Sequence, residues 1–190
     1  MSLTLLPGDA AQYKKIALLG ALCLVLSLFE YMIPKPLPFL RTGIANLPVM
    51  IALYILPFKS ILVLAAVKAL GQALITGTLF SYIFLFSAAG IAASVLVMYA
   101  LRRMFGQGQG ALQIRRISFI GLGVAGAVVS NAAQLLLAWF FVFGSSVRYI
   151  VPPFLAAGII SGAALGVFCE CFVRRSRWYA EMTLDRGDAE

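Results

Sequence analysis

The stretch VLAAVKALGQALITGT, residues 63–78, places a lysine and other polar residues inside an apolar segment. Lys68, Gln72 and Thr76 are spaced four residues apart, which puts them on one face of a helix. Lys68 lies roughly nine residues into the segment, or ~13 Å along the axis at a rise of ~1.5 Å per residue. A charge at that depth in a bilayer costs several kcal/mol, with estimates from ~3 upward. The stretch therefore predicts a membrane helix whose polar face has partners in a helical bundle.

A second apolar segment carries a matching polar group. In GAVVSNAAQLLLAWF, residues 126–140, Asn131 and Gln134 are three residues apart and share a helix face beside Ser130. The least costly arrangement lets the polar groups of the two helices face each other. Two interpretations follow, an interhelical polar clamp or a ligand cavity. The cavity is favoured because a buried lysine brings a charge that amides do not neutralise.

The whole chain is strongly apolar. Of its 190 residues, 62% are hydrophobic and 12% are charged, which is typical of a multi-pass membrane protein. We expect a short cytosolic N-terminus over residues 1–15, a single membrane domain over residues 16–175 and a polar cytosolic tail over residues 176–190. This organisation leaves no soluble catalytic domain.

Apolar runs separated by proline, glycine and basic residues predict an all-α membrane domain of six transmembrane helices. Most of the 15 Lys and Arg residues fall in loops on one side of such a bundle. The positive-inside rule then predicts a multi-pass protein of the cell membrane with both termini in the cytosol. The net charge of +8 is explained by this asymmetry, so no nucleic-acid partner is expected. The expected helices cover residues 16–33, 43–57, 60–79, 81–101, 117–143 and 152–172, the second being short and partly inserted from the outer face.

The sequence lacks the usual groups of a catalytic site. It has no histidine and seven acidic residues, and only Glu30 and Glu170 belong to the expected helices, at opposite ends. Proton transfer and covalent catalysis need a base or an activated nucleophile. Three cysteines without histidine or nearby carboxylates do not make a metal site. We therefore expect a protein that is not an enzyme, with no catalytic residue, metal or cofactor.

Small residues mark two helix faces. Ala17 and Ala21 form a small-xxx-small pair in the first helix, and Gly158, Gly162 and Gly166 repeat the same spacing in the last. Faces of this kind let a second helix approach closely. They predict close helix contacts, either inside the bundle or with a partner.

These features together resemble a known family. The stretches PFLRTGIANLPVMIALYILPFK (residues 38–59) and SNAAQLLLA (residues 130–138), the Lys68 helix and the alanine pair resemble an S-component of the energy-coupling factor (ECF) vitamin transporters. The narrower resemblance, over roughly residues 14–175, is to the group known as Gx transporters or heptaprenyl diphosphate synthase component I. It implies an S-component-like bundle with a ligand site near the outer face, under the loop after the first helix. It also implies that Ala17 and Ala21 dock a transmembrane coupling protein that carries two ATPase subunits.

The expected function is therefore a substrate-binding membrane subunit for a small, vitamin-like molecule. An anionic ligand is favoured because Arg41, Lys68 and Arg148 are opposed only by Glu30. A flavin nucleotide fits, with Phe80, Tyr82 and Trp139 as a flat apolar wall, and a prenyl phosphate is the runner-up. Two other functions remain open, a non-catalytic membrane partner in isoprenoid diphosphate synthesis and an autonomous carrier. The expected ligand-binding residues are Lys68, Gln72, Asn131, Gln134, Arg41, Asn46 and Tyr82.

Overall fold

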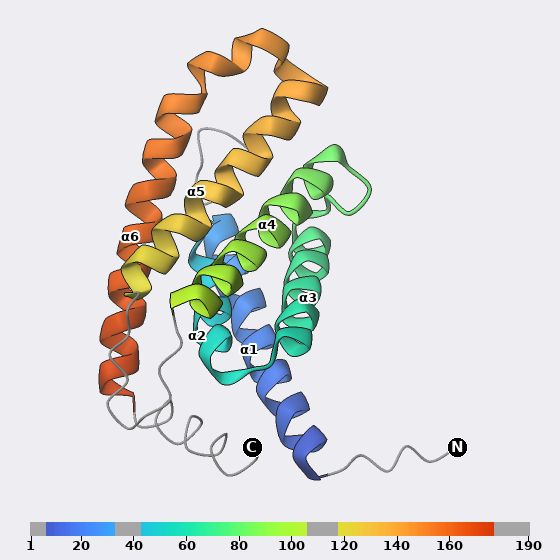
Figure 1. Cartoon of the computed structure of the whole chain (residues 1–190). Coiled ribbons are helices and arrows are strands. Elements are labelled where there is room, and N and C mark those ends of the chain that lie inside the picture. Colours follow the sequence, from blue (N-terminus) through green and yellow to red (C-terminus); the bar gives the residue numbers. More distant parts are fainter. Residues whose placement is uncertain (1–6, 33–42, 106–117, 177–190) are drawn as a thin grey trace.

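The computed structural model describes residues 7–32, 43–105 and 118–176, and the elements in these ranges are all helical (Figure 1). They contain six α-helices, a short π-helical turn and two 3-10 turns. In chain order the elements are α1 (Pro7–Met32), η1 (Ile44–Asn46), α2 (Leu47–Ile55), α3 (Phe58–Thr76), α4 (Tyr82–Phe105), α5 (Phe119–Ala138), η2 (Trp139–Phe143), η3 (Gly144–Tyr149) and α6 (Val151–Arg175).

The helices begin and end where local chemistry requires it. Pro57 precedes α3 in an extended conformation, and Gly77 ends it with a φ of 66°, a left-handed conformation that glycine adopts without a Cβ clash. Ser118 caps α5 by accepting a hydrogen bond from the backbone N–H of Ile120 at 3.2 Å. The first helix, α1, begins at Pro7 and therefore starts earlier than the predicted start near Ile16.

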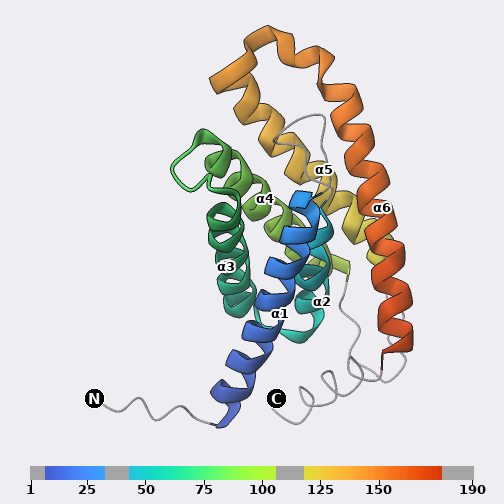
Figure 2. The same ribbon diagram turned by 180° about the vertical axis from the view of Figure 1, so that it is seen from behind.

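Five of the helices, α1, α3, α4, α5 and α6, are long and apolar enough to cross a membrane. The prediction of an all-helical membrane protein is thereby confirmed. The apolar segment Ile44–Ile55, expected as the second transmembrane helix, is shorter than these five. The side of the membrane on which the termini lie stays a prediction, although α1 begins and α6 ends at the same end of the bundle (Figures 1 and 2).

The short helix α2 lies at the centre of the bundle. Its residues from Val49 to Leu53 are no more than 1% exposed, and they belong to the main core cluster with Leu19, Ile61 and Phe119. A helix that is apolar all round is stable only when other elements surround it. Accordingly α2 contacts α1, α3, α4, α5 and α6.

Glycines allow α5 and α6 to pack closely as an antiparallel pair, which projects beyond the other helices at one end of the molecule (Figure 1). A Cβ added to Gly162 would lie 2.6 Å from the carbonyl oxygen of Gly123, and one added to Gly166 would lie 2.3 Å from the Cα of Ile120. Neither position can take a side chain without moving a backbone. The close-packing face predicted from Gly158, Gly162 and Gly166 is confirmed, and it packs against α5 within the bundle.

Candidate functional site

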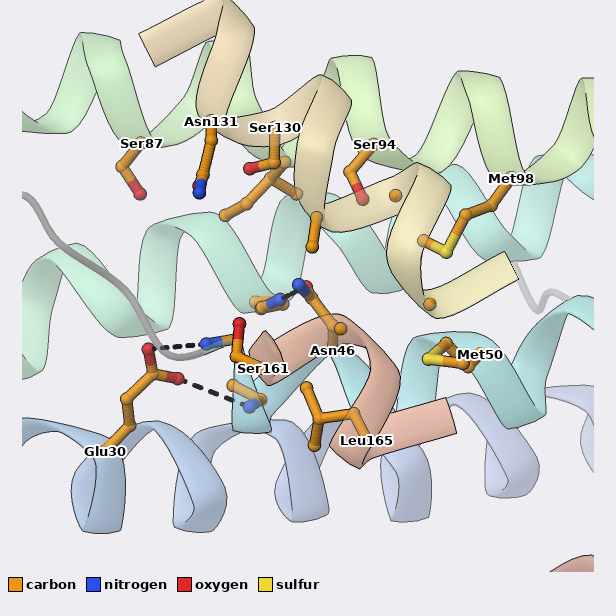
Figure 3. Close-up of a pocket in the computed structure, with 18 of the residues that line it drawn as sticks. Glu30, Asn46, Met50, Ser87, Ser94, Met98, Ser130, Asn131, Ser161 and Leu165 are labelled. Carbon is orange, nitrogen blue, oxygen red and sulfur yellow. Dashed lines mark hydrogen bonds between the residues drawn. The ribbon is translucent and has the colours of Figure 1, made fainter. Parts of the chain in front are cut away.

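A polar chamber of about 40 Å³ lies inside the bundle beside the first turn of the η1–α2 segment. All six α-helices or their connecting turns contribute to its wall, and most of its lining side chains are polar or small. Figure 3 shows Ser87 and Ser94 on one side, Glu30 on the other and Asn46 between them. Because one water needs roughly 10–15 Å³ of such volume, the chamber holds a few waters or a small chemical group.

The polar residues singled out on two distant segments come together here. Lys68 and Gln72 of α3 line the chamber with Asn131 and Gln134 of α5, and each is 3–5% exposed. Asn46 of η1 lies between these helices and is half-buried. The structure therefore joins five of the seven residues expected to bind a ligand.

Other predicted residues lie elsewhere. Tyr82 is 62% exposed, packs its ring on Phe86 and is not part of the chamber wall. Phe80 and Trp139, expected with Tyr82 to form a flat apolar wall, also lie on the surface. Arg148 is exposed and contacts the neighbouring Tyr149.

Three further predicted residues lie in other parts of the chain. Arg41 lies outside the described residues. Ala17 and Ala21 are exposed on α1, away from the chamber.

The buried charge of Lys68 is stabilised by the first turn of the short helix. Its ammonium group donates a hydrogen bond to the side-chain oxygen of Asn46. An amide oxygen directed at an ammonium group replaces part of the hydration that the charge loses on burial. This contact crosses from α3 to η1 rather than to α5, so it is not the predicted clamp between the two polar helices.

Glu30 holds the same turn from the opposite side. The carboxylate is 1% exposed and accepts hydrogen bonds from the backbone N–H groups of Gly43 at 3.0 Å and Ala45 at 3.4 Å. Unpaired N–H groups at a helix start favour an anion. Gly43 has a φ of 78°, a conformation that turns the chain into η1. Sequence reasoning found Glu30 only as a lone acidic residue and missed that it caps this turn.

The side-chain amides of Asn131 and Gln134 on α5 fit inside the bundle because each lies against a glycine of a neighbouring helix. Asn131 donates a hydrogen bond to the backbone oxygen of Phe154 in α6 at 3.0 Å, and a Cβ on Gly158 would lie 2.3 Å from its side-chain nitrogen. Gln134 donates to the hydroxyl of Ser130 at 3.2 Å, and a Cβ on Gly90 would lie 2.5 Å from its nitrogen. The chamber wall on this side is therefore shaped by tight packing.

Two buried polar atoms in the chamber wall have no hydrogen-bond partner among the described residues. They are the side-chain oxygen of Gln72 and the hydroxyl oxygen of Ser94. Leaving such a group unpaired costs about 1–3 kcal/mol, so each is a position where a water or ligand is stabilised. Sequence reasoning chose Gln72 but missed Ser94, which reads there as one of many small residues in its helix.

The acidic residues and cysteines of the described ranges do not gather into one cluster. No group of three His, Cys, Asp or Glu residues with a metal-binding arrangement occurs in those ranges. Glu170, the other membrane-segment carboxylate, accepts hydrogen bonds from Ser118 and Arg174 near the end of α6. It contributes nothing to the chamber wall.

Comparison with known proteins identifies one family. The model of the family described as heptaprenyl diphosphate synthase component I matches residues 19–172, which covers most of the chain. Neither the curated proteins nor the solved structures gave a match.

Proposed function

The chain belongs to the heptaprenyl diphosphate synthase component I family, and from this premise we propose that it is the substrate-binding membrane subunit of an ECF-type transporter. In this proposal it binds a small molecule in the polar chamber and passes it on together with a coupling protein and two ATPase subunits. It carries out no chemistry on the ligand. This part of the proposal rests on the sequence, which has no histidine and places only two carboxylates, Glu30 and Glu170, in the apolar spans long enough to cross a membrane.

The observation that carries the proposal is the pair of unpartnered atoms in the chamber. Gln72 presents an acceptor and Ser94 a hydroxyl to an enclosed space, and neither is paired within the described residues. A purely structural clamp would be expected to pair its own polar atoms, because each orphan lowers stability. Convergent unpaired groups in a chamber support a binding role.

The charge and the size of the chamber limit which ligands it can bind. Lys68 and Glu30 both line it, so its described wall carries one cation and one carboxylate rather than an excess of positive charge. An anionic ligand would depend on Arg41, outside the described residues. Ligand pockets usually measure ~300–1,000 Å³, so a flavin-sized molecule requires the helices around this chamber of about 40 Å³ to separate.

An exposed face on α1 supports the partner half of the proposal. Ala17 and Ala21 are exposed, and Leu18, Leu22 and Val25 on the same helix are 40–50% exposed. Because Ala17 and Ala21 are exposed, a small-residue surface is available to another membrane helix. Docking of a coupling protein there is consistent with the arrangement.

A second candidate function is favoured by the family description. The words "component I" describe one part of a synthase, and a chain without histidine is compatible with a non-catalytic membrane partner in isoprenoid diphosphate synthesis. The two functions make different predictions. A transporter subunit co-purifies with ATPases, whereas a synthase partner stimulates a soluble prenyl synthase.

The test is native mass spectrometry of the full chain, purified in mild detergent from cells that also express an ECF coupling module. We expect a retained small molecule and associated ATPases in the wild type. Replacing the chamber groups by Ser94→Ala together with Gln72→Met is expected to release the molecule and to keep the ATPases. Uptake in cells that lack ATPase partners would instead identify an autonomous carrier, and an empty chamber without partners would contradict the proposal.

A further inference from the structure

A second cavity opens on the side of the bundle next to the polar chamber. This lateral groove, of about 570 Å³, lies between α1, the η1–α2 segment and α6. Its lining is apolar, with Leu26, Leu47 and Phe168 among its walls, and Ser161 is the one polar residue among the described residues that line it. Its volume falls within the ~300–1,000 Å³ typical of ligand pockets.

The groove and the chamber are neighbours separated by a thin partition. Ser161 and Leu165 of α6 line both cavities. A Cβ placed on Gly43 would lie 3.6 Å from a terminal methyl group of Leu165, so this side chain closes against the turn that Glu30 caps. Figure 3 shows Ser161 and Leu165 reaching from α6 toward the pocket beside Glu30 and Asn46. The side chains of Ser161 and Leu165 are therefore the described groups that lie between the two spaces.

The rim of the groove faces the surroundings of the bundle. Leu22 of α1 is 40% exposed and Phe168 of α6 is 57% exposed, and both lie in membrane-length helices. An apolar opening between two such helices gives access from the hydrocarbon layer rather than from water. A molecule with an apolar chain can therefore approach the chamber sideways.

The chemistry of the two cavities is complementary. The chamber offers an unpaired acceptor on Gln72 and an unpaired hydroxyl on Ser94, within a described wall whose one lysine is accompanied by Glu30. Its small volume of about 40 Å³ admits a head group of a few atoms, and the larger groove admits a chain. A hydroxyl head would donate to Gln72 and accept from Ser94.

We propose that the ligand is a single-chain amphiphile that enters from the bilayer, with an uncharged hydroxyl-bearing head in the chamber and its apolar chain in the lateral groove. This inference rests on the proposed binding function and names its substrate class. A two-chain phospholipid does not fit, because its phosphate head is charged and larger than the chamber.

The probe is hexadecanol with a photoactivatable group midway along its chain, added to the full-length protein in phosphatidylcholine nanodiscs. We expect saturable labelling of the groove, with Leu22 and Phe168 among the labelled sites, competed by hexadecanol and much less by hexadecane or hexadecyl phosphate. Ser94→Ala and Gln72→Met should each raise the half-saturating concentration by about three- to tenfold, the effect of one lost hydrogen bond.

A substitution in the lateral groove tests the site for the ligand's apolar chain separately from the site for its head group. Ala164 is exposed on α6 and lines the groove, so Ala164→Trp should fill it and lower labelling at least about tenfold without disturbing the core. Ala156 is exposed on the same helix outside the groove lining, so Ala156→Trp is the matched control and should label normally.

The outcomes distinguish this inference from the proposed function. Competition by hexadecane as strong as by hexadecanol, with no effect of the chamber variants, would show a groove that only seats bulk lipid and would overturn the inference. If the chamber variants release a retained polar molecule while Ala164→Trp keeps it, the binding function stands and the amphiphile is wrong. If none of these variants changes any binding, both proposals fail.

Discussion

The ammonium group of Lys68 donates a hydrogen bond to the side-chain oxygen of Asn46, and so ties the middle of α3 to the turn that starts the short central helix. Glu30 of α1 holds the backbone of that turn from the other side. The turn at the start of α2 is therefore held by two buried ionisable side chains from two different helices. Changes at either anchor should affect both the fold and the chamber.

Removing the charge of Lys68 tests its role in binding. Lys68→Met keeps most of the side-chain length and removes the donor to Asn46. We expect ligand binding to weaken because the η1 part of the chamber wall loses its bond to Lys68, by up to the ~1.5–3 kcal/mol of a hydrogen bond to a charged group. Calorimetry with the molecule retained by the wild type measures the change. Lys59→Met, at an exposed position in the first turn of α3, is the matched control. Unchanged affinity in both Lys68→Met and Asn131→Ala would leave the chamber a structural clamp.

Neutralising Glu30 tests the anchor of the η1 turn. In Glu30→Gln a charged acceptor for the N–H groups of Gly43 and Ala45 becomes a neutral amide with one acceptor oxygen. Charge-assisted bonds are about twice as strong as neutral ones, so we expect a loss of ~1–2 kcal/mol in stability. Thermal unfolding in detergent gives this value.

The control for that measurement is Glu170→Gln. Glu170 pairs with Arg174 at 2.8 Å, and the arginine side chain is 76% exposed. Exposed pairs contribute ~0–1 kcal/mol, so the control should unfold close to the wild-type temperature. Equal effects of the two variants would argue that the buried carboxylate has no special role at the start of η1.

Placing a large side chain on the exposed surface of α1 tests partner docking. Ala17→Trp and Ala21→Trp should each abolish co-purification of the coupling protein, because close helix approach does not tolerate a large side chain. The variants should remain folded, since both alanines are exposed in the bundle. Ala92→Trp, at an exposed position on α4, should leave docking intact. Normal co-purification of both α1 variants would place the docking surface elsewhere.

Cysteine labelling tests the orientation in the membrane. In a cysteine-free background, Arg148→Cys should react with an impermeant maleimide added outside the cell, because this exposed residue follows α5 at the predicted outer end. Arg103→Cys, exposed in the last turn of α4, should react only after the membrane is permeabilised. The opposite pattern would reverse the predicted topology. Val147 is a poor reporter because it is 8% exposed.

The sequence predicted the helices and part of the site for different physical reasons. Long apolar runs identify membrane helices directly, and a buried lysine with amides at helical spacing points to an interior face. That spacing placed Lys68 with Gln72, and Asn131 with Gln134, on one face of each helix, and the meeting of the two faces was an inference from the cost of burying them. Roles that depend on contacts across the bundle, such as the capping of η1 by Glu30, leave no local pattern.

The surface positions of Tyr82 and Trp139 show a second limit of prediction from the sequence, which is the side of a membrane helix that faces the core. In water, a helix buries its apolar face, so its periodicity reveals which side faces the core. In a bilayer the core and the surroundings are both apolar, and large aromatic side chains can face either. On the inner face of α4, Gly90 lies against Gln134 of α5, and Ser94 lies against Gly126 of α5, so close contacts at glycines accompany the burial of Ser94. Spacing along one helix does not report such contacts.

The shortness of the central apolar segment has a consequence for how the protein is made. Residues 44–55 are fewer than the ~20 needed to span the hydrocarbon layer, and the ends of this segment need protein partners for their backbone groups. We therefore expect the ribosome-bound chain to insert α1 first and to accept this segment only after later helices have entered. A nascent chain that ends at Pro57 and continues into a polar linker long enough to fill the ribosomal exit tunnel should leave a cysteine at position 50 open to aqueous alkylation, whereas Met50 of the finished protein is buried. Protection in the arrested chain would mean that the segment enters the bilayer unaided.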